Sequence, residues 1–380
     1  MKRSLNSRLL FLLLLLVGLA ARQLAREHRP SLLRPGLRMY AYVANSGSGT
    51  VSVVDLVGLK VVATIPVGTA PSGVRAHPTR KEIWGVSTGT GQLWIIDSPS
   101  GNVVARIPVG NSPFALDFSP DGRRAYVAAS GSNSVVAVDC EKRRVVAHAA
   151  VGRSPWVARI TPDGNTLLVP NRADATLTLL NAADLSTIAT IPVAPNPQHI
   201  EILPDNSKAF ISAAVSMRTS NGADQISVVD LHRRVLLTNL PLPGAASGLI
   251  LKPDGGELFV PAPQSHGLAI VNTWTNEVSE QVLIGSSPAQ SVLTSEGKFL
   301  YVSDSDGSRV IPMETEFRRV QKPIPVGQQP GVLRLTPGED LLLVINEKSN
   351  DLAVIRTHSQ SLITIIPVGD RPRDLAIKVF

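Results

Sequence analysis

One stretch of the chain decides the fold. It runs from Ile107 to Gly152 and reads IPVGNSPFALDFSPDGRRAYVAASGSNSVVAVDCEKRRVVAHAAVG. β-Branched and small apolar residues alternate with polar ones along it, which is typical of strands. Pro120-Asp121-Gly122 makes a tight turn, because Asp bonds the local backbone and Gly adopts positive φ. The stretch therefore predicts four short strands, at residues 112–119, 125–129, 134–139 and 144–151.

The same unit recurs along the chain. Each copy ends in Val-Gly or a close variant, and a proline usually follows about three residues later. These landmarks end at Gly68, Gly110, Gly152, Ala194, Gly244, Gly285, Gly327 and Gly369, and are spaced by 42, 42, 42, 50, 41, 42 and 42 residues. A period near forty with several strands per unit is the signature of a β-propeller. One unit cannot bury its own apolar faces, so the units must close into a ring.

The two ends of the chain decide the number of blades. Seven complete four-strand units lie between Gly68 and Gly369. Residues 39–68 supply three further strands, and residues 371–380 supply one first strand. We therefore predict an all-β, eight-bladed propeller of four-stranded blades, closed by pairing the two ends, which also removes exposed edges. The alternative is a ring of seven blades with a spare segment.

Three units carry a common tyrosine motif. It reads Tyr42-Val43-Ala44-Asn45, Tyr126-Val127-Ala128-Ala129 and Tyr301-Val302-Ser303. With the recurring Ile-Pro-Val-Gly and Ser-Pro-Asp-Gly, it makes the chain resemble the YVTN β-propeller repeat family over about residues 39–380. The resemblance implies a propeller outside the cytoplasm or at the cell surface, with no particular activity. Eight blades would be similar to the haem-d1-binding propeller of cytochrome cd1 nitrite reductase and its biosynthetic relatives.

The positive charge is concentrated before the repeats. The whole chain has a formal net charge of +7, but residues 30–380 hold 31 basic and 29 acidic residues, a net of +2. A nearly neutral propeller lacks the field that tracks phosphate backbones, so we expect no nucleic-acid partner. Cys140 is the sole cysteine and no internal disulfide can form.

The first residues resemble an export signal. Lys2, Arg3 and Arg8 precede an apolar run at Leu9–Leu19, and Gly18-Leu19-Ala20 offers small residues for cleavage. We interpret residues 1–21 as a signal peptide or short membrane anchor, residues 22–38 as an Arg- and Pro-rich tether and residues 39–380 as the propeller. We therefore expect the protein to be periplasmic or extracellular, to contact a membrane only through its N-terminal segment, and to be a monomer.

The first strand of each blade should line the central tunnel. The loops before the first strands and the loops between second and third strands should share one face of the ring, which we call the loop-bearing face. Two residues after the repeat proline, the ring reads Asp374, Gly73, Ala115, Val157, His199, Leu249, Gln290 and Val332. His199 and Asp374 lie opposite each other and could grip a ligand; alternatively, Asp374 pairs with Arg371 or Arg373. Two residues further, Arg75, Asp117, Arg159 and Glu201 alternate in charge and predict a belt of ion pairs.

Other candidate ligand-binding residues belong to the same face. Phe114 and Trp156 follow their prolines and could be binding anchors, with packing between blades as the alternative. The 50-residue spacing places extra residues around Arg218, which form either a partial lid or an inert insertion. Arg153, Arg172 and Arg373 are candidate partners for carboxylates, and His266 is the other candidate histidine.

The missing motifs narrow the function. The sequence has no Cys-x-x-Cys-His, His-Glu-x-x-His or Gly-x-Ser-x-Gly motif, so it supplies no complete catalytic or metal-binding set. We therefore expect a non-catalytic binding scaffold for a protein, a glycan or a surface component, and we predict no cofactor. One alternative is a haem-d1-like propeller with His199 as iron ligand. The other is a lactonase-like hydrolase, which would need carboxylates and amides clustered at the tunnel mouth.

Overall fold

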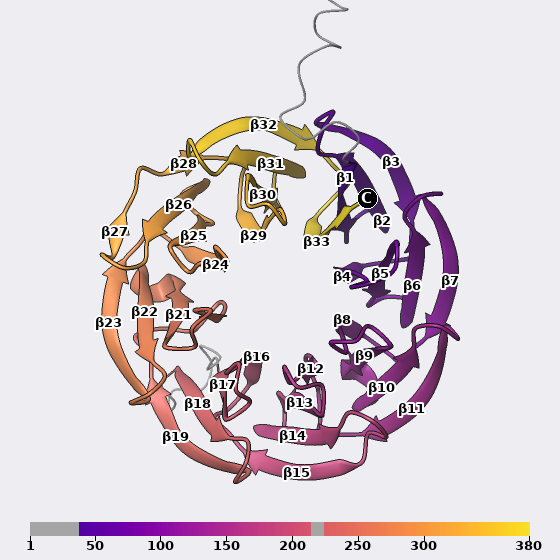
Figure 1. The fold of residues 1–380 in the computed structure, drawn as a ribbon, viewed down its shortest axis with the longest axis vertical. Helices are drawn as coiled ribbons and strands as arrows, with labels where there is room; N and C mark the ends of the chain where they lie inside the picture. The colour runs from indigo at the N-terminus through magenta and orange to yellow at the C-terminus, as the bar shows by residue number, and fades with distance from the viewer. Residues whose placement is uncertain (1–37, 214–223) are drawn as a thin grey trace, which may run out of the picture. The chain divides into compact units, whose positions relative to one another are not determined.

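The computed structural model describes residues 38–213 and 224–380, and these form eight antiparallel sheets arranged around a central axis (Figure 1). The prediction of an all-β, eight-bladed propeller is confirmed, and the seven-blade alternative is not needed. Each sheet is one blade, with its first strand innermost and its fourth strand outermost.

The first four blades hold the first half of the chain together with its last strand. Their strands are β33 (Pro372–Val379), β1 (Met39–Asn45), β2 (Thr50–Asp55) and β3 (Lys60–Pro66) in blade 1; β4 (Pro71–Ala76), β5 (Glu82–Ser87), β6 (Gln92–Asp97) and β7 (Asn102–Pro108) in blade 2; β8 (Pro113–Phe118), β9 (Arg124–Ala129), β10 (Ser134–Asp139) and β11 (Arg144–Ala150) in blade 3; and β12 (Arg159–Ile160), β13 (Thr166–Asn171), β14 (Thr176–Asn181) and β15 (Thr187–Pro192) in blade 4.

The remaining blades follow in chain order. Their strands are β16 (Pro197–Ile202), β17 (Lys208–Ala213), β18 (Gln225–Asp230) and β19 (Val235–Pro241) in blade 5; β20 (Ile250–Leu251), β21 (Glu257–Ala262), β22 (Gly267–Asn272) and β23 (Glu277–Leu283) in blade 6; β24 (Pro288–Leu293), β25 (Phe299–Asp304), β26 (Arg309–Glu314), β27 (Arg319–Val320) and β28 (Ile324–Pro325) in blade 7; and β29 (Pro330–Leu335), β30 (Leu341–Asn346), β31 (Asp351–Arg356) and β32 (Ser361–Pro367) in blade 8. Short 3₁₀ turns, η1 (Ser130–Ser132) and η2 (Pro263–Ser265), lie between second and third strands.

Blade 1 closes the ring with strands from both ends of the described chain. Strand β33 pairs antiparallel with β1, and its register places Leu375 opposite Val43 and Ala376 opposite Tyr42. Leu375 is 1% exposed, so the closing strand is packed into the core. The two complementary fragments seen in the sequence therefore join as predicted.

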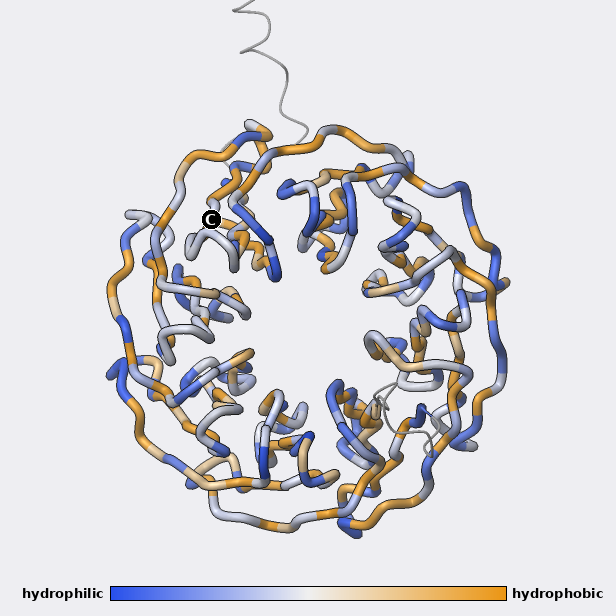
Figure 2. Tube along the Cα trace, turned by 180° about the vertical axis from the view of Figure 1, so that it is seen from behind, coloured by the Kyte–Doolittle hydropathy of each residue, from blue (hydrophilic) through white to orange (hydrophobic). Residues whose placement is uncertain are grey.

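The hydrophobic core lies between blades. The second and third strands are buried along almost their whole length, because both of their faces meet a neighbouring blade. One cluster joins Trp84 and Ile95 of blade 2 to Phe118 and Val127 of blade 3. The outermost strands instead alternate between exposed and half-buried residues, and Figure 2 shows the matching alternation of hydropathy around the rim. Burial between blades drives closure of the ring.

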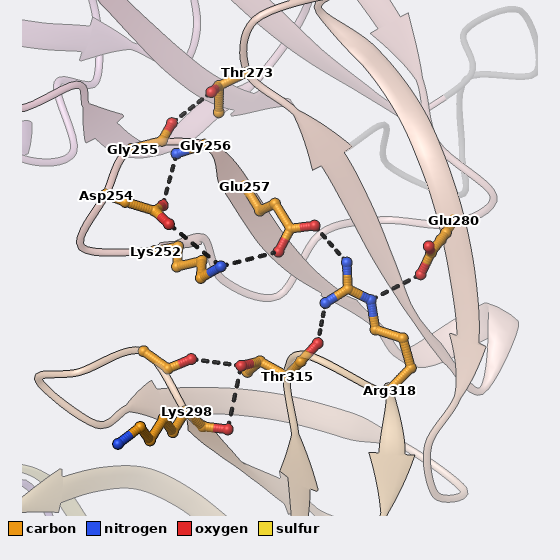
Figure 3. Close-up of polar contacts among 11 residues, drawn as sticks. Lys252, Asp254, Gly255, Gly256, Glu257, Thr273, Glu280, Lys298, Thr315 and Arg318 are labelled. Atoms are coloured by element: carbon orange, nitrogen blue, oxygen red, sulfur yellow. Dashed lines mark hydrogen bonds and ion pairs between the residues drawn. The ribbon is translucent and has the colours of Figure 1, made fainter.

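Polar bridges supplement this core at the face opposite the loops before the first strands. Arg318 of blade 7 donates through Nη2 to Glu257 and through Nε to Glu280 at 2.8 Å, both on blade 6 (Figure 3). Lys252 lies 3.3 Å from Asp254 and 3.8 Å from Glu257, so Glu257 is shared by two cations. The Arg318 contacts link two sheets that share no strand pairing, and Lys252 adds to the network within blade 6.

Candidate functional site

A three-layer stack of side chains lies on the loop-bearing face of blades 3 and 4. The rings of Phe114 and Trp156 are stacked, with centroids 3.8 Å apart and planes at 25°. The guanidinium carbon of Arg172 lies 4.5 Å from the Trp156 centroid, which is cation–π range. Because the Phe114 ring covers one face of the indole, the guanidinium takes the other. We call Phe114, Trp156 and Arg172 the rim stack.

Local backbone contacts hold the rim stack in place. The backbone N–H of Trp156 donates to the Pro170 carbonyl at 3.2 Å. This bond fixes the start of the first strand of blade 4 against its second strand. Arg172 follows that second strand, and its Nε donates to Asn196 Oδ1 of blade 5 at 2.8 Å. No carboxylate of the described residues pairs with Arg172. Burial lowers the pKa of its guanidinium, as expected for a cation that lacks a counter-charge.

A pocket of about 410 Å³ lies inside the ring of first strands, which is within the range of small-molecule sites. We call it the tunnel pocket. Its lining comes from blades 2 to 8: Arg75, Ala115, Leu116, Asp117, Val157, Ala158, Arg159, His199, Ile200, Glu201, Leu249, Ile250, Gln290, Ser291 and Arg334. Phe114 and Trp156 each directly precede a lining residue, so the rim stack stands beside the mouth of the pocket.

His199 and Gln290 are the polar residues nearest that mouth. Burial, and secondarily the charge of Arg172, lower the pKa of the His199 imidazole to about 4. The imidazole is therefore neutral at physiological pH. Its ring nitrogens make no hydrogen bond with the described residues, whereas Gln290 Nε2 donates to the Ser247 carbonyl at 2.6 Å. His199 thus offers a free donor and acceptor to a ligand.

Below them lies a ring of charged side chains, which we call the belt. It consists of Arg75, Asp117, Arg159, Glu201, Arg334 and Asp374. Arg159 lies 3.9 Å from Asp117 and 3.8 Å from Glu201, so this part of the predicted belt is confirmed. Burial raises the pKa of Glu201, and Arg159 opposes that shift.

Arg75 does not continue the alternation with Asp117. Its Nη1 lies 2.7 Å from Asp374, and Arg334 Nη2 lies 3.2 Å from the other oxygen of the same carboxylate. The Asp374 carboxylate raises the pKa of Arg75. Asp374 is 7% exposed and pairs with neither Arg371 nor Arg373, because its side chain turns sideways to blade 2 instead of back along its own strand.

The structure brings together some predicted site residues and separates others. Phe114, Trp156, Arg172 and His199 form one group at the pocket mouth, with Gln290 across the pocket. Asp374 lies in the belt, outside the pocket lining. The others have partners of their own: Arg153 pairs with Asp174 at 2.5 Å, Arg373 pairs with Glu347 at 3.0 Å, and exposed His266 contacts the Ser286 carbonyl through Nδ1. Arg218 lies outside the described residues.

Arg334 is a belt residue that the sequence interpretation missed. It stands four residues after Pro330, the same offset that separates Arg75 from Pro71 and Arg159 from Pro155. Carrying this count into the last repeat would have placed Arg334 in the belt. Nothing in the sequence pattern shows that it shares Asp374 with Arg75.

The described residues contain neither a cluster of metal-binding side chains nor a membrane-spanning helix. Within residues 38–213 and 224–380, no three His, Cys, Asp or Glu side chains are grouped so that they could hold a metal ion. The same part of the chain contains no helix long and apolar enough to cross a membrane. Cys140 is buried, and burial raises the pKa of its thiol to about 12, so it is an unreactive core residue.

These features define the class: an eight-bladed β-propeller with a charged pocket at the loop-bearing end of its tunnel. No protein-family model matches the chain, and no curated protein does either, so membership of the YVTN repeat family stays a resemblance. Solved propellers match its fold.

Dihydro-haem d1 dehydrogenase NirN, solved in complex with DHE, has a TM-score of 0.73 and 15% identity, over 88% of this chain and 74% of NirN. Apo AztD from Citrobacter koseri has a TM-score of 0.67 and 13% identity, over 90% of this chain and 98% of AztD. Kuenenia stuttgartiensis hydrazine synthase has a TM-score of 0.61 and 18% identity, over 76% of this chain and 95% of that chain. At such identities the likeness extends to the fold alone.

Proposed function

We propose that the protein is a non-catalytic, exported propeller that binds a protein, a glycan or another surface component through the loop-bearing face of blades 3 to 5. The observation that carries this proposal is the rim stack beside the mouth of the tunnel pocket. Half-buried aromatic rings and an arginine without a carboxylate partner are typical binding hot spots. Propeller loops at one face are free to vary while the blades hold them rigidly.

Export rests on the N-terminal sequence. The basic start, the short apolar run and the small residues at 18–20 support a signal peptide or anchor, and the buried lone Cys140 is compatible with an oxidising compartment. Fractionation of cells that carry the gene with a C-terminal tag tests this directly. Tagged protein found only in the cytoplasm would remove export from the proposal.

The binding face is tested with full-length protein immobilised and exposed to an envelope extract of the native organism and to a glycan array. We expect retained partners to be lost with Phe114→Ala and Trp156→Ala, each by at least about ten-fold in affinity, as for hot-spot aromatics. Trp274→Ala is the matched control, because Trp274 is 74% exposed but lies in the β22–β23 turn on the opposite face.

Two results would contradict this proposal. Either the wild-type protein retains no partner from any extract or array, or Trp274→Ala reduces binding as much as Trp156→Ala does. The second outcome would indicate that exposed tryptophan adsorbs material without a site.

A second candidate function is favoured by His199. A neutral imidazole in the tunnel suits iron, and Arg159 and Arg172 could take the carboxylates of a haem-type cofactor. His199 would hold the iron of such a group, and it would be the one imidazole to do so, since the described pocket lining contains no other. Haem titration followed by absorption distinguishes this candidate: it requires a Soret shift that His199→Ala removes.

A lactonase-like hydrolase has less support. The two carboxylates that line the described pocket, Asp117 and Glu201, are both held next to Arg159. They do not cluster with amides at the mouth, as that chemistry would need.

A further inference from the structure

The belt charges are not equally accessible from the tunnel pocket. The side chains of Arg75, Arg159 and Arg334 are 34, 43 and 39% exposed, and all three line the pocket. The side chains of Asp374, Asp117 and Glu201 are only 10, 24 and 22% exposed. Although the six charges cancel, a molecule in the pocket therefore meets mainly guanidinium groups.

The two aspartates are held in the wall by backbone donors of the next blade. Asp374 accepts from the Val74 N–H at 3.1 Å, and Asp117 accepts from the Ile160 N–H at 3.3 Å. These bonds join the first strands of neighbouring blades; Asp374 lies outside the pocket lining, and Asp117 lines the pocket with one carboxylate oxygen bound to the wall. The two aspartates thus use part of their acceptor capacity on the wall, while the arginines keep unused N–H donors.

Of the three belt arginines, Arg159 has the most N–H donors without a hydrogen-bond acceptor. Its contacts with Asp117 and Glu201, at 3.9 and 3.8 Å, are longer than hydrogen bonds, and its guanidinium makes no hydrogen bond with the described residues. A guanidinium carries five N–H donors in a fork that matches a carboxylate or a phosphate. An unsatisfied guanidinium facing a pocket is a site for such a group.

The three arginines also lie close enough to act on one another. Burial lowers the pKa of the Arg334 guanidinium, Asp374 opposes that shift, and the charges of Arg75 and Arg159 add to it. Like charges brought together in a partly buried pocket repel each other, so an anion bound among them is stabilised.

We propose that the tunnel pocket is an anion site, in which Arg159, Arg334 and Arg75 bind a carboxylate or phosphate group. This group belongs to one end of a ligand, and the other end of the same ligand lies on the rim stack. This deepens the proposed function and rests on it. His199 and Gln290 line the path between rim and belt. The ligand is therefore elongated, with an apolar or sugar-like part at the mouth and an anionic end inside.

The test is calorimetric titration of the full-length protein at low salt with two probes, inorganic phosphate and citrate. We expect at least one probe to bind, with an affinity that falls as salt is added. Arg159→Gln and Arg334→Gln should each weaken binding by about ten-fold or more, because each removes a charge-assisted hydrogen-bond donor. Arg123→Gln is the matched control, since Arg123 is 86% exposed in a turn on the opposite face.

A folding defect is distinguished by the double variant Arg159→Gln with Glu201→Gln. It removes both members of the Arg159–Glu201 pair, so no unpaired carboxylate remains at position 201, and Asp117 keeps its backbone donor. The ring should therefore stay folded while anion binding is lost. The probe that binds more tightly identifies the anion class, carboxylate or phosphate.

The inference is overturned if neither probe binds at millimolar concentration, or if binding persists in the arginine variants. If a captured partner is lost with Trp156→Ala but kept by the Arg159 and Arg334 variants, the anion site is ruled out and the proposed function still stands. If Trp156→Ala and the arginine variants all leave a partner bound, both proposals fall.

Discussion

The protonation state of single residues follows from their place in the ring. His199 is an ordinary histidine in sequence, yet the tunnel wall buries it beside Arg172 and both effects favour the neutral imidazole. In the unfolded chain the same residue titrates near pH 6.5. The difference makes the stability of the fold depend on pH at this position.

The first prediction concerns that dependence. Because the pKa of His199 is lower in the folded state, the unfolded chain binds more protons, and the stabilisation is present above about pH 6.5 and lost as the pH falls toward 4. His199→Gln should therefore lose less stability than the wild type on acidification, by up to about 1.4 kcal/mol per pH unit in this window. Urea unfolding at pH 7, 6 and 5 measures the difference. A constant difference between the two proteins would contradict the pKa shift.

The second prediction concerns Arg318, which bridges blades 6 and 7 (Figure 3). Arg318 adopts a φ of 54°, so Arg318→Asn keeps a residue that tolerates this conformation while it removes the guanidinium and shortens the aliphatic stem. Its side chain is 21% exposed, and we expect a loss of about 1–3 kcal/mol from the free energy of unfolding.

The control for Arg318 is Arg233→Asn. Arg233 is 79% exposed and lies 4.0 Å from Asp230, and such surface pairs contribute less than about 1 kcal/mol. Equal losses for the two variants would show that the bridge between blades does not stabilise the ring.

At the scale of the strand, β33 does two tasks. It completes the sheet of blade 1 next to β1, and it carries Asp374, the acid shared by Arg75 and Arg334. Leu375 is fully buried, whereas Ile377 and Val379 are half-buried. The strand therefore contributes its hydrogen-bonding edge, the core side chains of Leu375 and Ala376, and the charge of Asp374.

The third prediction is that removing residues 371–380 abolishes the stable ring. The deletion exposes the edge of β1, removes about 1.5–3 kcal/mol of burial at Leu375 alone and leaves two tunnel arginines without their carboxylate. Because typical domains are stable by only about 5–15 kcal/mol, the truncated protein should aggregate or melt far below the full chain. Size-exclusion chromatography and thermal melting measure this. Deletion of Phe380 alone is the control, and an unchanged melting temperature in the larger deletion would contradict the role of β33.

At the scale of the whole molecule, the ring is closed by strand exchange between the chain's two ends. The other seven sheets each use one continuous piece of chain, so they hold to their neighbours by side-chain packing. Blade 1 differs because backbone hydrogen bonds join β1 (Met39–Asn45) to β33 (Pro372–Val379), which are far apart in the sequence. Opening the ring at this point requires breaking a sheet.

The fourth prediction uses a permuted chain. Residues 371–380 followed by the turn sequence of residues 119–123 are inserted between Arg38 and Met39, and the chain ends at Asp370. All eight blades then consist of continuous chain, so the protein should fold with the same circular-dichroism spectrum. It should melt at a lower temperature, because only side-chain contacts, and no strand pairing, then close the ring. A melting temperature equal to or above that of the wild type would show that strand exchange adds nothing.

Much of the fold and part of the site could be predicted from the sequence. Counting from each repeat proline placed Phe114, Trp156 and His199 at the loop-bearing end and Arg159 in a charged ring, because residues at equal offsets lie at equal heights in equivalent strands. The partners of Asp374 could not be found in this way. They belong to blades 2 and 8, and the choice among nearby arginines depends on side-chain direction.

By itself, the sequence determined the blade, the number of blades and the closure by complementary ends. These follow from local patterns, turn chemistry and a repeat length, which act within some forty residues. Only the tertiary structure decided that Trp156 is stacked between Phe114 and Arg172, and that the belt arginines are more exposed in the tunnel than their acids. Such contacts join strands of different blades, and their distances are set by how the closed ring packs.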